Sequence, residues 1–270
     1  MVTAYSAAPR FEMGRVVKRT FGVIGSNIAA FVVLSVVPGL AWAVAGLAGN
    51  QFEVDLAAST FPESSTILLF VIAGLIYLAT GVVLQAGVVH GAVISLSGRR
   101  VSIADCLATG LKYVLPLFLI GLLATLGVVA GLMLLIVPGV MLAVMWVAVA
   151  PACVVEHTGV FGAFSRSREL TRGYRWPIFG LYILFFILMF IITFVVGLLI
   201  GLATGASMIA VSPEVAAAGM TDTSMMELAT SAVSTMLMSI ITSALAASVY
   251  YELRQIKEGI GPEALASVFD

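Results

Sequence analysis

Residues 159–180 read GVFGAFSRSRELTRGYRWPIFG and carry four of the thirteen Lys and Arg residues in the chain. These four are Arg166, Arg168, Arg172 and Arg175, which fall within ten positions. The chain as a whole is 61% hydrophobic and only 10% charged. A concentration of positive charge in so apolar a sequence predicts a loop at one face of a membrane.

Uninterrupted apolar runs fill most of the remaining sequence. The mean hydropathy is +1.15, and several uncharged runs reach the roughly 20 residues that a helix needs to cross a hydrocarbon layer of about 30 Å. We therefore predict an all-α, polytopic membrane protein in which residues 1–270 form a single integral membrane domain. The six expected spans cover approximately residues 27–49, 66–96, 112–136, 139–156, 176–210 and 227–253.

The third and fourth expected spans are separated only by Pro138 and Gly139, which are typical turn residues. Residues 139–156 would form a helix of only about 27 Å at 1.5 Å per residue. A re-entrant segment is therefore the alternative to a fourth crossing.

The distribution of charge favours six crossings with both termini in the cytoplasm. On that topology, the segment before the first span, residues 97–112, residues 157–175 and the tail 254–270 lie on one side. They hold four, three, four and two Lys or Arg residues, which are all thirteen. Residues 50–65 and 211–227 lie on the other side and contain acidic residues but no basic ones. This partition is what the positive-inside rule predicts for a multi-pass membrane protein.

Three segments on the basic side share a layout, and each precedes a helical hairpin. They are residues 11–27, 101–116 and 159–177. In the first, small or apolar residues recur at three- or four-residue steps from Phe11 to Ile24, opposite Glu12, Arg15 and Arg19. This spacing predicts an amphipathic helix over residues 11–26 in the plane of the headgroups. The expected fold is thus six transmembrane helices as three hairpins, each preceded by a cytoplasmic interfacial helix.

Several blocks of the sequence resemble the glycerophosphoryl diester phosphodiesterase membrane-domain family and its uncharacterised UPF0259-like relatives. The first block, residues 11–27, matches the family loosely. The family's central block corresponds here to Pro138, Gly139, Trp146, Pro151, Glu156, Ala163, Arg166, Ser167, Leu170, Thr171 and Gly173. Its closing block corresponds to Tyr251, Leu253, Arg254, Glu258 and Gly259. The resemblance implies a membrane region, and phosphodiesterase activity is not expected from it.

The basic residues are the candidate binding groups, because each one near a membrane surface adds about 1 kcal/mol of attraction to anionic lipid. We expect the following residues to engage headgroups or a partner protein: Arg15, Lys18, Arg19, Arg99, Arg100, Arg166, Arg168, Arg172, Arg175, Trp176 and Arg254. Glu156 is expected to form an ion pair with Arg166 or another loop arginine.

The sequence contains few candidates for catalysis or metal binding. Its two histidines, His90 and His157, lie in different segments, so neither a metal site nor a cofactor is expected. Gln85 and His90 are polar residues within the second span, where hydrogen bonding to a neighbouring helix is favoured over a proton or solute path. Cys106 and Cys153 are expected to be small buried residues without a redox role.

Glycines repeat every four residues on the expected spans, and such repeats let helices approach closely. They occur at Gly127 and Gly131 and at Gly197, Gly201 and Gly205. Packing within the chain is the expected role, with self-association as the alternative.

Two classes of function remain open. The favoured class is a non-enzymatic membrane-organising or accessory protein that binds anionic phospholipid or a partner protein through its basic face. The alternative is a transporter or lipid-translocating protein with a cavity between its hairpins. An interfacial enzyme is disfavoured, and nucleic acid is not an expected partner.

Overall fold

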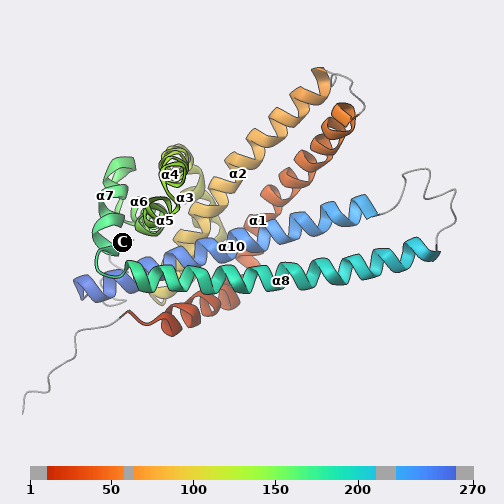
Figure 1. Ribbon diagram of the computed structural model, residues 1–270. Coiled ribbons are helices and arrows are strands. Elements are labelled where there is room, and N and C mark those ends of the chain that lie inside the picture. The colour runs from red at the N-terminus through yellow and green to blue at the C-terminus, as the bar shows by residue number, and fades with distance from the viewer. Residues whose placement is uncertain (1–10, 58–63, 211–222, 260–270) are drawn as a thin grey trace, which may run out of the picture. The chain divides into compact units, whose positions relative to one another are not determined.

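The computed structural model of the protein describes residues 11–57, 64–210 and 223–259. Every regular element within these ranges is an α-helix (Figure 1), so the predicted all-α class is confirmed. The helices are α1 (Met13–Ala57), α2 (Ser64–Leu96), α3 (Ile103–Lys112), α4 (Val114–Leu134), α5 (Ile136–Met145), α6 (Val149–Glu156), α7 (Gly159–Thr171), α8 (Arg175–Ala210) and α10 (Thr223–Glu258).

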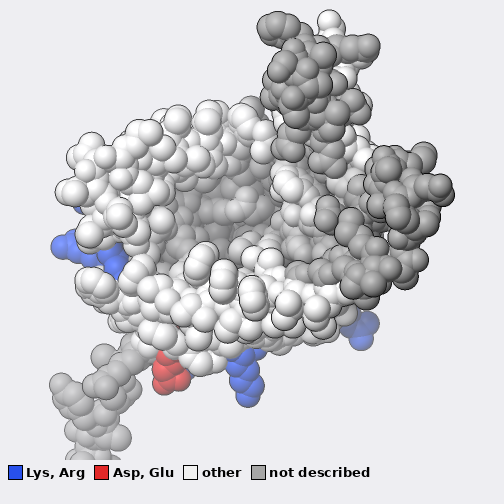
Figure 2. Space-filling model, turned by 45° about the vertical axis from the view of Figure 1, so that its right-hand side comes forward, with Lys and Arg blue, Asp and Glu red and all other residues white. Residues whose placement is uncertain are grey.

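Six stretches of the described chain are long and apolar enough to cross a membrane. They are Met13–Leu47, Ser64–Leu96, Val114–Leu134, Ile136–Glu156, Arg175–Val195 and Thr230–Glu258. Large apolar side chains such as Leu75, Leu126 and Phe186 are exposed on them. On the face shown in Figure 2 the described surface is almost wholly uncharged, and the visible Lys and Arg side chains lie at its edges. These features are those of a multi-pass membrane protein.

The turn between α4 and α5 differs from the expected one. The helix breaks at Leu135, whose backbone is extended (φ −163°, ψ 149°), and Pro138 with Gly139 lies inside the first turn of α5. Proline is tolerated there because the first N–H groups of a helix have no intrahelical acceptor. The prediction of a turn at Pro138 and Gly139 is therefore wrong.

Other helix ends also shift from their expected positions. Non-helical backbone at Asn27 kinks α1 (φ −127°, ψ 19°), near the expected boundary between the interfacial helix and the first span. The fourth apolar stretch is divided into α5 and α6 by a turn at residues 146–148. Helix α10 continues to Glu258, so Arg254, which was expected in a tail, lies within a helix. Residues 260–270 of the expected tail lie outside the described residues.

The chain forms two compact units, the first of which is Met1–Leu34, Val82–Leu181 and Ile240–Asp270. Its core contains α6, in which every residue from Val149 to Val155 is buried. Tyr250, Leu253 and Leu170 are also fully buried here. This unit contains all of the candidate binding residues.

The second unit is Ser35–Gly81 and Tyr182–Ser239. In it, Trp42 Nε1 donates a hydrogen bond to Ser231 Oγ over 3.3 Å, and the Trp42 and Tyr77 rings lie 5.0 Å apart. A Cβ atom at Gly39 would come within 2.4 Å of the Met236 sulfur, so this glycine allows a close helix contact.

Glycines also allow the close approach of α4 and α5 in the first unit. A Cβ at Gly127 would lie 2.6 Å from the Trp146 ring, and one at Gly131 would lie 2.9 Å from the Gly139 Cα. The two helices are thus packed backbone to backbone. The surroundings of Gly197, Gly201 and Gly205 lie outside what the structure describes, so their packing role stays a prediction.

Candidate functional site: a basic pocket beside helix α5

Two groups of basic residues can be distinguished in the first unit, and the first group is paired with carboxylates. Arg15 Nε lies 2.9 Å from Glu252 Oε1, and Arg19 contacts the other oxygen of the same carboxylate. Arg19 also donates to Gln255 Oε1 over 2.8 Å. Glu252 is only 1% exposed. These ion pairs therefore connect the beginning of α1 to α10.

A second cluster of pairs connects α6, α7 and α10. Arg166 Nε donates to Glu156 Oε2 over 2.6 Å, and the same guanidinium contacts Glu258. Arg254 Nε donates to Glu258 Oε2 over 2.8 Å, and the Tyr250 hydroxyl donates to Glu156 Oε1 over 2.7 Å. Burial alone would lower the pKa of Arg166, but these two carboxylates raise it above its ordinary value. Arg166 is therefore a permanently charged structural group.

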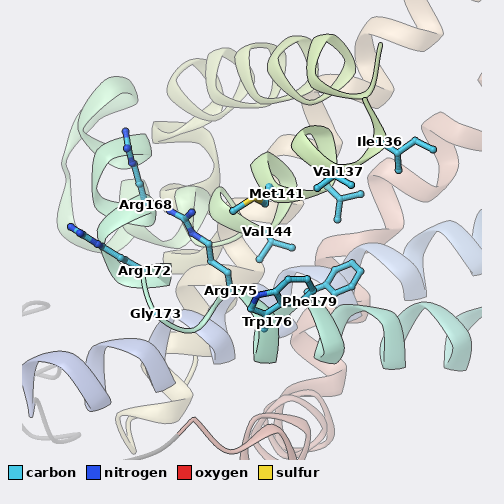
Figure 3. Close-up of a pocket in the computed structure, with 11 residues that line it drawn as sticks. Ile136, Val137, Met141, Val144, Arg168, Arg172, Gly173, Arg175, Trp176 and Phe179 are labelled. Atoms are coloured by element: carbon cyan, nitrogen blue, oxygen red, sulfur yellow. The ribbon is translucent and has the colours of Figure 1, made fainter. Parts of the chain in front are cut away.

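The second group of basic residues lines a pocket of about 690 Å³ in the first unit. Its wall consists of Ile136, Val137, Val140, Met141, Val144, Arg168, Arg172, Gly173, Arg175, Trp176 and Phe179. Figure 3 shows the arginines gathered at one end of the pocket and Ile136 at the other. The pocket is therefore apolar along α5 and positively charged at one end.

The arginine end of the pocket is held against α5 by two hydroxyl groups of α7. Ser167 Oγ donates to the Met145 carbonyl over 2.8 Å and accepts from the Ala148 N–H over 3.2 Å. Thr171 Oγ1 lies 3.3 Å from the same carbonyl. These bonds satisfy backbone groups that the break between α5 and α6 leaves without helical partners.

The connection between α7 and α8 turns at Gly173, whose φ of +92° falls in the left-handed region. Glycine adopts that conformation without steric cost. The turn places Arg172 at the end of α7 and Arg175 at the start of α8, on the same pocket. Trp176 beside them is 82% exposed.

The charge of the pocket is not neutralised by the described residues. Arg168, Arg172 and Arg175 have no carboxylate within ion-pair distance in the described part of the chain. Arg175 Nε is also buried without a hydrogen-bond partner among those residues. A buried donor without a partner costs about 1–3 kcal/mol, so this atom marks a place that suits an anionic acceptor.

The pocket contains no group for acid–base catalysis. Its lining has no carboxylate, imidazole, thiol or hydroxyl side chain, and a guanidinium does not lose its proton near neutral pH. Among the described residues, no three His, Cys, Asp or Glu side chains are placed to hold a metal ion. The chemistry available in the pocket is therefore binding of an anion next to an apolar chain.

The remaining candidate residues lie elsewhere. Lys18, Arg99 and Arg100 are exposed. His90 is buried, whereas Gln85, five residues earlier on α2, is exposed. His157 hydrogen-bonds to the Tyr113 hydroxyl through Nδ1.

Comparison with known proteins identifies the family. Residues 110–265 match the family model described as the membrane domain of glycerophosphoryl diester phosphodiesterase, which is more than half of the chain. The chain belongs to this family.

A UPF0259 membrane protein of Pectobacterium carotovorum subsp. carotovorum (strain PC1) is 33% identical over 123 residues. That stretch is 44% of this chain and 49% of the relative, so the chain spans about half the length of the curated relative that it matches. No solved structure matches the chain. The matched family region contains the pocket and the ion-pair cluster around Arg166.

Proposed function

We propose that this chain is a non-enzymatic protein of the bacterial inner membrane that binds anionic phospholipid through its basic face. In this role it organises the membrane or serves as an accessory subunit for a partner protein. The observation that carries the proposal is the pocket beside α5, where an apolar wall ends in three arginines that no described carboxylate neutralises. A phospholipid has the same two parts, an apolar chain and an anionic phosphate.

The unsatisfied Nε of Arg175 supports a phosphate as the anion. Arginine presents several N–H donors in a planar fork that matches phosphate oxygens. Arg168 and Arg172 add charge around the same end of the pocket. Trp176 is highly exposed beside them, and tryptophan is enriched at the headgroup level of membranes.

The proposed orientation places this basic end at the cytoplasmic surface, with both termini on that side. The positive-inside rule supports this orientation, because all thirteen basic residues then lie on one side. In the proposed arrangement, the start of α1, the short helix α3 and the charged helix α7 lie along the cytoplasmic surface, and each precedes a helical hairpin.

The first test is a lipid titration of the detergent-solubilised protein with phosphatidylglycerol and, separately, phosphatidylcholine. We expect tighter binding of phosphatidylglycerol, and we expect Arg172→Gln with Arg175→Gln to weaken it. At about 1 kcal/mol per basic residue, the double variant loses a factor of about 30 in affinity.

A matched control removes two charges from the same basic face but outside the pocket. Arg99→Gln with Arg100→Gln is expected to change phosphatidylglycerol affinity by less than about threefold, because neither residue lines the pocket. Equal losses in the two double variants would indicate diffuse attraction to the surface and would contradict a pocket site. Equal affinity for the two lipids would contradict anionic selectivity.

A further inference from the structure

The hairpin formed by α4 and α5 is too short to cross a membrane if the arginines of α7 stay at the surface. Ser167 and Thr171 hydrogen-bond to the Met145 carbonyl, which fixes α7 and its charges at the C-terminal end of α5. From that end to the hairpin turn, α5 has ten residues, which rise about 15 Å. This is about half of a hydrocarbon layer of about 30 Å.

The contacts of α4 give a similar length for the other arm of the hairpin. Gly127 lies against the Trp146 ring, which follows Met145 directly. Only residues 128–134 of α4 extend beyond this contact toward the turn, and they rise about 11 Å. Both arms therefore place the turn within one leaflet's depth of the α7 arginines.

The direction of the hairpin is consistent with a turn that lies within one leaflet's depth of the α7 arginines. Figure 1 looks nearly along the axes of α4 and α5, whereas residues 240–258 of α10, in the same compact unit, run across the view. Helix α10 ends at the ion-paired basic cluster. The hairpin thus lies across α10 and does not run alongside it.

The side chains of the turn are apolar and exposed. Residues 126–145 contain no polar side chain, and the five residues around the turn are 69–83% exposed: Met133, Leu134, Leu135, Ile136 and Val137. A turn that emerged on the far side of the membrane would place these side chains in water. Acyl chains are the surroundings that match them.

The turn between the two helices is short. Leu135 is the single non-helical residue, and its N–H bonds to the Gly131 carbonyl over 3.0 Å. Pro138 has no N–H, so it removes one of the donors that the first turn of a helix leaves unpaired.

We infer that the α4–α5 hairpin is embedded in the acyl chains of the leaflet on the arginine side and does not cross the bilayer. Two of the six crossings expected from the sequence are then replaced by one re-entrant hairpin. The partition of charge is unchanged, because a re-entrant hairpin returns to the side from which it came. The inference goes beyond lipid binding in the pocket and does not depend on it.

Cysteine accessibility tests the depth of the turn in the full-length protein. In a Cys106→Ala, Cys153→Ala background, Leu135→Cys is placed in the turn, and Ser64→Cys, at the exposed start of α2, serves as the control. A membrane-impermeant maleimide is applied to spheroplasts and to inverted vesicles. We expect Ser64→Cys to react from the outer face and Leu135→Cys to react from neither face. A bimane label introduced at Leu135→Cys in detergent, followed by reconstitution, should be quenched by lipids that carry a spin label on the acyl chain.

Labelling of Leu135→Cys from the outer face, as for Ser64→Cys, would overturn the inference, since the turn would then have crossed. Labelling from the inner face would also overturn it, because the turn would lie in water and not in lipid. Efficient cross-linking of Leu135→Cys between two copies would show that the turn contacts protein and not acyl chains, which would also overturn the inference. Met133→Cys, at the most exposed of these positions, repeats the experiment if the first variant fails to accumulate.

Discussion

Arg15 and Glu252 are 237 positions apart in the sequence, yet Arg15 Nε donates a hydrogen bond to Glu252 Oε1 over 2.9 Å. Arg19, one turn further along α1, contacts the second oxygen of the same carboxylate. The first turns of α1 and the last turns of α10 are thus joined through one buried anion. Two arginines expected at lipid headgroups thus form ion pairs with Glu252, and the Arg15 side chain remains 40% exposed.

Glu252→Gln is predicted to destabilise the protein, because it removes the charge that two arginines share. Hydrogen bonds to charged groups contribute about 1.5–3 kcal/mol, and we expect a loss of free energy of unfolding in that range. Thermal unfolding in detergent measures it. The control is Glu12→Gln, whose side chain is 65% exposed and lies 3.6 Å from Arg15. That variant should change stability by less than about 1 kcal/mol, and equal losses in both would argue against a buried structural role for Glu252.

Ser167→Ala is predicted to loosen the attachment of α7 to the break between α5 and α6. The substitution leaves the Ala148 N–H without its acceptor, which costs about 1–3 kcal/mol for a buried group. We also expect weaker lipid binding, since the arginine end of the pocket depends on this attachment. Ser165→Ala, two residues away and exposed, is the matched control for stability and for phosphatidylglycerol titration. A Ser167→Ala protein as stable as the control would contradict this role.

Gly139→Ala is predicted to destabilise the α4–α5 hairpin. The added Cβ would lie 2.6 Å from the Leu132 backbone nitrogen, and overpacking of this kind costs about 1–3 kcal/mol. Gly121→Ala is the control, because a Cβ there meets nothing within 4 Å and alanine is the better helix former by up to about 1 kcal/mol. The two variants should therefore shift the unfolding temperature in opposite directions, and a stabilising Gly139→Ala would refute the close contact.

Cys106 is predicted to be unreactive in the folded protein. Burial, with a smaller contribution from the Asp105 charge, raises the pKa of the Cys106 thiol to about 11, and only the thiolate reacts with maleimides. In a Cys153→Ala background, labelling at pH 8 should be at least about a hundredfold slower than in the unfolded chain. Rapid labelling of the folded protein would show that α3 leaves Cys106 accessible.

The same pKa shift predicts a loss of stability at alkaline pH. The raised pKa in the folded state means that the neutral thiol favours folding, and this contribution is complete below the unfolded value of 9.0. It is lost as the pH rises from about 9 to about 11. Cys106→Ala should have a flatter stability profile over that window, which thermal unfolding at stepped pH measures. An unchanged slope would indicate that another group is responsible.

The sequence predicts the helices well but places some of their ends incorrectly. Long apolar runs identify helices because a membrane leaves the backbone few alternatives. The turn assigned to Pro138 and Gly139 lies instead at Leu135, because the first turn of a helix accepts proline and a close contact requires glycine at position 139. The break at residues 146–148 contains no glycine or proline from which it could be predicted. Its backbone groups are satisfied by Ser167, a contact that no local pattern shows.

The candidate site is predictable only in part for the same reason. Glu156 was expected to pair with Arg166 or another loop arginine, and its carboxylate accepts a hydrogen bond from Arg166. The participation of Tyr250, Arg254 and Glu258, about ninety residues away, depends on tertiary packing. Without that packing, the sequence alone did not separate the arginines that α6 and α10 neutralise from those that line the pocket. The apolar wall along α5 was not predicted at all, since its residues resemble any other lipid-facing run.

The central claim is that the pocket retains an anionic phospholipid, and native mass spectrometry of the protein extracted gently from its own membrane tests it most directly. The wild-type protein should carry one tightly held anionic phospholipid. The Arg168→Gln, Arg172→Gln, Arg175→Gln protein should lose that lipid, while the Arg99→Gln, Arg100→Gln protein keeps it. A wild-type protein that emerges without lipid, or a triple variant that holds the same lipid as tightly, would contradict the account.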